Sequence, residues 1–121
     1  WPNEEFASVL LIVRTEYLEN NPETILKWVE SHEKTVTWIN SNPDKSKSLF
    51  SSFLIDYMGK SLPTKIIDES FSNITITSDP IKNSVIIFAE RADSLGYLGR
   101  DGYNLDGIFY NAVLNVNNGD L

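Results

Sequence analysis

The chemistry open to this chain depends on one histidine and on its carboxylates. His32 is the single histidine and cysteine is absent, so thiolate metal sites, disulfides and cysteine nucleophiles are excluded. His32 falls on the apolar stripe of a helical pattern, which favours a packed histidine over the base of a catalytic triad. Glu4 and Glu5, or the scattered Glu23, Glu30 and Glu33, could supply an acid/base pair, but nothing in their spacing selects one pair. We therefore predict no catalytic residue, no metal ligand and no cofactor.

The glycine-rich segment 99–107, GRDGYNLDG, invites comparison with a calcium loop. A loop of that kind supplies oxygen ligands at alternate positions and closes with a glutamate. Here Tyr103 occupies a ligand position and no glutamate follows at the closing one. The segment is therefore predicted to be a loop without a bound ion.

Composition indicates a globular chain that does not bind nucleic acid. Of the 121 residues 41% are hydrophobic and 22% charged, which is typical of a folded domain. The net charge is -7, from 10 basic and 17 acidic residues, so there is no basic surface to replace the counterions of a nucleic acid. The longest apolar runs, Val9–Val13 and Val85–Ala89, are far shorter than the about 20 residues of a membrane-spanning helix.

The elements that must position any site begin with the run Val9–Val13, VLLIV. Five consecutive apolar residues without alternation predict a strand covered on both faces. We expect a strand at 9–14 and only one other, at 74–77 (ITIT), and two strands do not form a covered sheet. The missing neighbours would come from a part of a larger protein or from a second copy of the chain.

Helices are predicted where an Asn or Asp precedes a proline, since the first can cap and the second can occupy the first helical position. Residues 14–20 are expected to form a single turn, and 108–116 a short helix or turn. Helix starts are expected at Asn21-Pro22, Asn42-Pro43, Pro63 and Asp79-Pro80, with ends at Gly59, Asn73 and Gly96 for the last three.

Four segments, in order, carry a family resemblance. They are VRTEYLENNPE (13–23), WINSNPDKS (38–46), SDPIKNS (78–84) and LDGIFY (105–110). Together they resemble the C-terminal third of the solute-binding proteins of ABC importers for nitrate, sulfonates and taurine. The resemblance extends from about residue 6 to about residue 115, and its segments are structural landmarks rather than catalytic motifs.

The resemblance implies an α+β, predominantly α chain that is a fragment of the type II periplasmic-binding-protein fold, with four to five helices, an apolar crossover strand and one short strand. Residues 1–121 would be a single fragment, with a hinge segment at 1–8, the crossover strand at 9–14, a helical portion at 22–98 that includes strand 74–77, and a loop and C-terminal helix at 99–121.

The resemblance also implies a function without enzymatic activity. Proteins of this family close around a small solute and present it to the permease subunits of an ABC importer. The chain would be extracytoplasmic, either periplasmic or anchored to the outer face of the cell membrane. Phe6 and Ser8, just before the crossover strand, are the expected contacts to an anionic or zwitterionic solute. A fragment is expected to bind no solute alone and to dimerise. The aliphatic sulfonate and thiamine-precursor branches are alternatives for the parent protein.

Two other functions are open on the residues alone. A self-contained helical interaction module would use Trp28, Trp38 and the tyrosines and phenylalanines as its partner surface. It would be a monomer that buries Val9–Val13 within its own chain. A small hydrolase would use Glu4, Glu5 or Asp101 and would need a carboxylate in a pocket.

Overall fold

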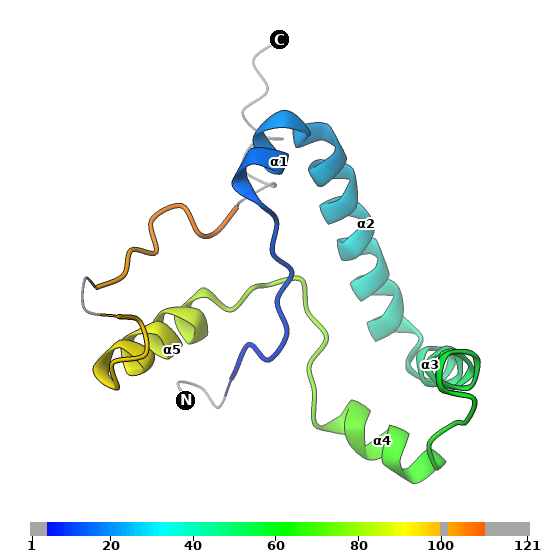
Figure 1. Cartoon of the computed structure of the whole chain (residues 1–121). Helices are drawn as coiled ribbons and strands as arrows, with labels where there is room; N and C mark the ends of the chain where they lie inside the picture. Colours follow the sequence, from blue (N-terminus) through cyan, green and yellow to red (C-terminus); the bar gives the residue numbers. More distant parts are fainter. Residues whose placement is uncertain (1–4, 100–101, 111–121) are drawn as a thin grey trace. The chain divides into compact units, whose positions relative to one another are not determined.

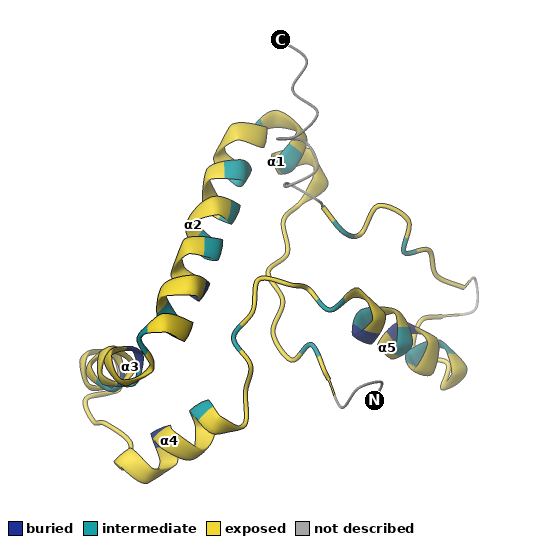
Figure 2. Ribbon diagram, turned by 180° about the vertical axis from the view of Figure 1, so that it is seen from behind, coloured by how far each residue is buried: buried dark blue, intermediate teal, exposed yellow. Residues whose placement is uncertain are grey.

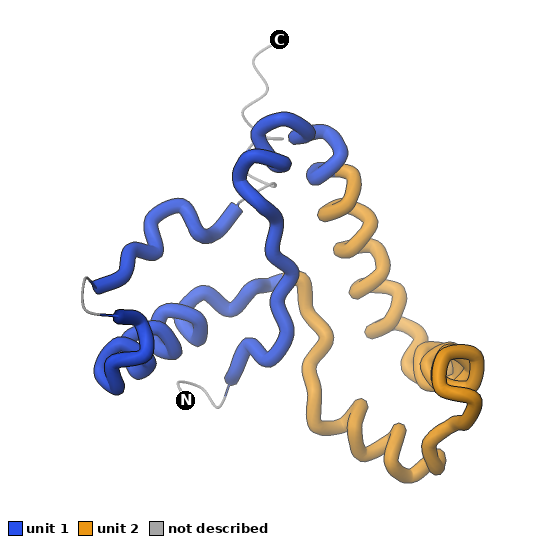
Figure 3. Tube along the Cα trace, in the orientation of Figure 1, with its two compact units in different colours: residues 1–26, 79–121 blue, residues 27–78 orange. Residues whose placement is uncertain are grey.

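The computed structural model describes residues 5–99 and 102–110. Over these residues the chain forms five α-helices and no strand (Figure 1). The helices are α1 (Thr15–Asn20), α2 (Pro22–Ser41), α3 (Pro43–Met58), α4 (Thr64–Ser72) and α5 (Lys82–Ser94). The chain divides into two compact units, residues 1–26 with 79–121 (unit 1) and residues 27–78 (unit 2) (Figure 3). Each unit is described by itself.

The predicted α+β fold with strands at 9–14 and 74–77 is wrong, and with it the implied fragment of a type II periplasmic-binding-protein fold. Among the described residues both segments are non-helical and neither belongs to a sheet. A strand is stable only when its backbone groups pair with a neighbour. The carbonyl oxygen of Ile76 instead accepts a hydrogen bond of 3.0 Å from the side-chain amide of Asn40 on α2. The apolar sequence of the two segments predicted strands, but within the described residues neither segment has a strand to pair with.

The asparagines before α2 and α3 bind the preceding turn of helix. The Nδ2 atoms of Asn21 and Asn42 each donate to the carbonyl oxygen four residues earlier, over 3.1 and 2.9 Å. Asn42 makes no side-chain N-cap hydrogen bond. The predicted starts at Pro22 and Pro43 are confirmed, because proline fits the first helical position. The predicted Asx cap at Asn42 is wrong, since its amide satisfies a carbonyl group of α2 instead.

The starts of the other helices depart from prediction in small ways. Residues Thr15–Asn20, expected to be a turn, form helix α1. Helix α4 begins at Thr64, directly after Pro63. Helix α5 begins at Lys82 rather than at Pro80, because the N–H of Ile81 donates to the Asp79 carboxylate over 2.8 Å. Ile81 then has a φ of 49°, a left-handed conformation that strains a β-branched residue.

The predicted helix ends at Gly59 and Asn73 are confirmed. Gly59 has a φ of 75° and its N–H donates to the carbonyl oxygen of Ile55 over 2.8 Å. Glycine is favoured there because a Cβ would be strained in the left-handed region. Asn73 follows α4 directly. Helix α5 ends at Ser94, just before the predicted Gly96.

Unit 2 contains the small core formed by α2, α3 and α4. One apolar side chain from each of these helices is buried: Val36, Leu54 and Ile67. An ion pair and an aromatic contact join α3 to α4. The Nζ atom of Lys47 lies 2.7 Å from the Asp68 carboxylate, and the Phe50 and Phe71 rings meet edge to face at 5.8 Å.

In unit 1, segments before and after α5 contact this helix. Ala89 and Ser84 are buried there. The ring of Phe6 lies 6.2 Å from that of Phe88, and the Nζ atom of Lys82 lies 5.4 Å from the centre of the Phe109 ring. The segment before α1 and the segment after α5 are thereby both tied to this helix. The predicted helix or turn at 108–116 is not helical at 108–110, and its remainder lies outside the described residues.

Most of the described residues are exposed, as the prevailing yellow in Figure 2 shows, and many large apolar side chains are among them. Only four apolar side chains of the described residues are buried. Val9 and Ile12 are each 89% exposed and Tyr57 is 79% exposed. Contiguous exposed apolar residues usually mark surfaces that contact another molecule.

Candidate functional site

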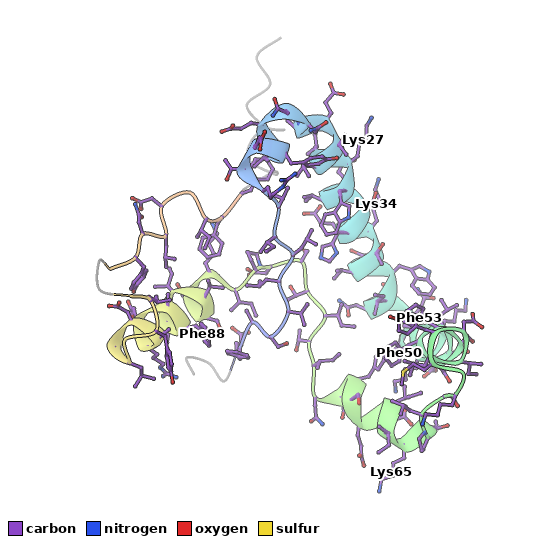
Figure 4. The ribbon with its side chains drawn as sticks, viewed as in Figure 1. Lys27, Lys34, Phe50, Phe53, Lys65 and Phe88 are labelled. Carbon is purple, nitrogen blue, oxygen red and sulfur yellow. The ribbon has the colours of Figure 1, made fainter. Side chains whose placement is uncertain are left out.

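The expected solute contacts, Phe6 and Ser8, lie in unit 1 on a short segment anchored to α5. The N–H of Ala7 donates to the Oγ atom of Ser84 over 3.0 Å. The Phe6 ring packs at 56° to the Phe88 ring, which is labelled on α5 in Figure 4. A backbone hydrogen bond at Ala7 and a ring contact at Phe6 thus hold the segment against α5.

Each of the two predicted residues presents part of its side chain to solvent. Phe6 keeps 45% of its surface exposed despite the contact with Phe88, and Ser8 is exposed. An exposed hydroxyl beside a half-covered aromatic ring can donate a hydrogen bond to an anion and pack against its apolar part. Phe6 and Ser8 lie two positions apart on this short surface segment of unit 1.

Sequence reasoning missed the two residues of α5 that hold this segment. Ser84 and Phe88 are four residues apart, so they share one face of the helix. The sequence feature that could have identified this contact is a serine among the apolar positions Ile81, Val85 and Phe88. A polar residue on such a face is buried only when it has a partner, and for Ser84 that partner is the backbone of the Phe6 segment.

An open hollow of about 530 Å³ follows the C-terminal half of α2 in unit 2. Its lining residues form stripes four residues apart along the helix: Glu33, Thr37 and Ser41 on one, Lys34, Trp38 and Asn42 on the other. One carboxylate (Glu33) and one ammonium group (Lys34) are among the lining residues, so the charges of the lining balance. Lys34 is labelled in Figure 4.

His32 is part of the packing on α2. Its ring lies parallel to that of Trp28, with centres 5.1 Å apart and an interplanar angle of 12°. The two residues are one helical turn apart, and His32 is partly buried. This stacking accounts for the position of the histidine without a catalytic partner.

Tyr103 lies close to the acidic last turns of α5 in unit 1. Partial burial raises the pKa of its phenol above 10.0, and the negative charges of Glu90 and Asp93 raise it further. The phenol therefore keeps its proton at neutral pH and acts there as a hydrogen-bond donor.

The carboxylates considered for hydrolysis do not form a described site. Glu5 is exposed, while Glu4 and Asp101 lie outside the described residues. Within 5–99 and 102–110, no group of three or more histidine, aspartate or glutamate side chains could hold a metal ion. None of the helices described here is both long and apolar enough to cross a membrane.

No protein-family model, curated protein or solved structure matches the chain.

Proposed function

We propose that the chain is part of the solute-binding component of an ABC importer for a small anionic or zwitterionic solute such as nitrate, taurine or an alkyl sulfonate. The proposal rests on the order and spacing of the segments at 13–23, 38–46, 78–84 and 105–110. It assigns the chain no catalytic step. Binding and release of the solute, outside the cytoplasm and in contact with permease subunits, would be its whole function.

The structural observation that supports the proposed solute contact is the anchoring of the Phe6–Ser8 segment. Ser84 and Phe88 hold it from one side, and the Ser8 hydroxyl remains exposed. A solute contact needs a polar group on a fixed backbone, because a mobile one loses conformational entropy when it binds. In this proposal Phe6 covers the apolar part of the solute and Ser8 donates to its oxygen atoms.

One hydroxyl cannot enclose a solute, so the chain of 121 residues is expected to bind weakly when alone. Isothermal titration calorimetry with nitrate, taurine and an alkyl sulfonate should give no tight binding for this chain. The natural protein that contains it should bind one of the three. Absence of binding by the natural protein would overturn the proposal, and tight binding by the isolated chain would show that the chain itself completes the site.

Substitution in the natural protein tests the role of Ser8. Loss of a hydrogen bond to a charged group costs about 1.5–3 kcal/mol, so Ser8→Ala should weaken binding at least about tenfold. Ser52→Ala is the matched control, since Ser52 bonds its own helix at the carbonyl oxygen of Ser48. Equal affinities for the two variants would exclude Ser8 as a contact.

An interaction module is the second candidate, favoured by the exposed aromatic residues of unit 2. Phe53 and Tyr57 stack at 5.7 Å on the surface of α3, and Trp38 is 41% exposed. Aromatic residues of this kind are enriched at protein interfaces. The same hypothesis predicted that the chain buries Val9–Val13 itself, and the exposure of this run counts against it.

A further inference from the structure

Within the segment Ser8–Arg14 of unit 1, the apolar run Val9–Val13 presents unpaired backbone as well as exposed side chains. Its central residue, Leu11, is 65% exposed, and Val9 and Ile12 are more exposed still. Among the described residues, no hydrogen bond involves the backbone of residues 9–13. A free apolar backbone of this length is a template for pairing with another chain.

The hydrogen bond of Ala7 indicates which edge of the segment is turned toward α5. In an extended chain the N–H and C=O groups of successive residues point to opposite edges. The N–H of Ala7 points to Ser84 on α5, so odd-numbered residues turn their backbone groups toward that side. When the segment is extended, Leu10 and Ile12 turn their N–H and C=O groups to the opposite edge.

Charge determines the orientation of a partner on that edge. The apolar run has Glu5 as the nearest charged residue before it and Arg14 directly after it. A second copy in parallel would place each charge beside its like. An antiparallel copy separates like charges and brings Arg14 of each chain toward the end that carries Glu5 of the other.

We propose that the segment Ser8–Arg14 pairs antiparallel with the same segment of a second copy of this chain, with Leu11 opposite Leu11. This register places Val9 opposite Val13 and Leu10 opposite Ile12, so all five apolar residues face apolar ones. A shift of the two-fold axis to Leu10 would place Ser8 opposite Ile12. The pairing forms only between two chains, and it is independent of the solute-binding proposal.

Both copies use the same edge, so the arrangement closes as a symmetric dimer. Leu10 and Ile12 exchange the backbone hydrogen bonds. Leu11 then belongs to a pair that is not hydrogen-bonded, in which the Cα atoms of opposite residues are about 4.5 Å apart. Because each chain carries a net charge of -7, repulsion opposes association, and added salt should strengthen the dimer.

Single cysteines test this register in a chain that has none of its own. Two copies of Leu11→Cys would meet within the Cα separation that a disulfide spans. Val9→Cys is the matched control, because it is also exposed but would lie opposite Val13, about 13 Å from its counterpart. Under the same mild oxidation Leu11→Cys should form a disulfide dimer at least about tenfold faster than Val9→Cys. Equal rates would overturn the proposal and indicate non-specific aggregation.

Light scattering over a dilution series provides the second test, on the unmodified chain. The expected mass is twice the chain mass of 13.7 kDa, falling to the single mass on dilution. Leu11→Asp and Leu11→Lys should each be monomeric and should form a dimer when mixed, since opposite charges then face each other. A monomer at every concentration and salt overturns the proposal, as does a failure of the mixed variants to pair. Circular dichroism of each variant checks that its helices are retained.

Discussion

Two neighbouring isoleucines on α4 test how much the small core of unit 2 stabilises the fold. Ile67 is 4% exposed and Ile66 is 43% exposed, although both belong to the same helix. Truncation of a buried isoleucine to alanine costs about 2–5 kcal/mol. With so few buried neighbours we expect the lower end, about 2–3 kcal/mol, for Ile67→Ala.

Ile66→Ala is the control, because it makes the same chemical change on the same helix. The side chain of Ile66 is already largely exposed, so its truncation removes less buried apolar surface, and alanine is the better helix former. The loss in the free energy of unfolding should therefore be at most about 1 kcal/mol. Ile67→Val removes only one methyl group and should cost about 0.5–1.5 kcal/mol, less than Ile67→Ala.

The assay should follow unit 2 separately, since the two units need not unfold together. Trp28 and Trp38 both lie in unit 2, so a Trp1→Phe background makes tryptophan fluorescence specific to it. Urea denaturation then gives the free energy of unfolding at an unchanged dependence on urea. A cost for Ile66→Ala equal to that for Ile67→Ala would refute the assignment of Ile67 to a stabilising core.

Two further predictions concern a helix end and a phenol. Gly59→Ala should destabilise α3 by about 1 kcal/mol, because the left-handed φ of 75° strains alanine. Urea denaturation measures this change, and Ser61→Ala, in the following segment, is the control. Glu90→Gln should lower the pKa of Tyr103 toward 10.0, read as the tyrosinate absorbance that Tyr103→Phe removes. Because folding raises this pKa, its contribution to stability is present below pH 10.0 and is lost as the pH rises through the folded-state value. An unchanged titration in Glu90→Gln would exclude the carboxylate as a cause.

The helices were predictable because their signals are local. Pro22 and Pro43 mark helix starts, and Gly59 and Asn73 mark ends, each through the conformation of one or two residues. The errors have local causes as well. The carboxylate of Asp79 takes the N–H of Ile81, and this contact delays the start of α5 beyond Pro80. Such choices between alternative side-chain partners are nearly equal in energy, so the sequence alone does not resolve them.

The candidate site was predictable only in part. Phe6 and Ser8 came from the resemblance, whereas Ser84 and Phe88, which hold their segment, are far away in sequence. The bond from Ala7 to Ser84 joins residues 77 positions apart. Helical spacing indicates that Ser84 and Phe88 share a face, but it carries no information about which distant segment that face binds.

The two expected strands show the same limit more sharply. An unbroken apolar run indicates that both faces of a segment need to be covered. In the structure Val9–Val13 is exposed, so this cover is missing. A helix satisfies its own backbone, so its sequence can specify it alone. A strand forms its backbone hydrogen bonds with another segment, so its own sequence indicates that a partner is required but not which segment it is. A comparison of disulfide formation by Leu11→Cys and Val9→Cys identifies this partner, because it reports which backbone lies opposite the run.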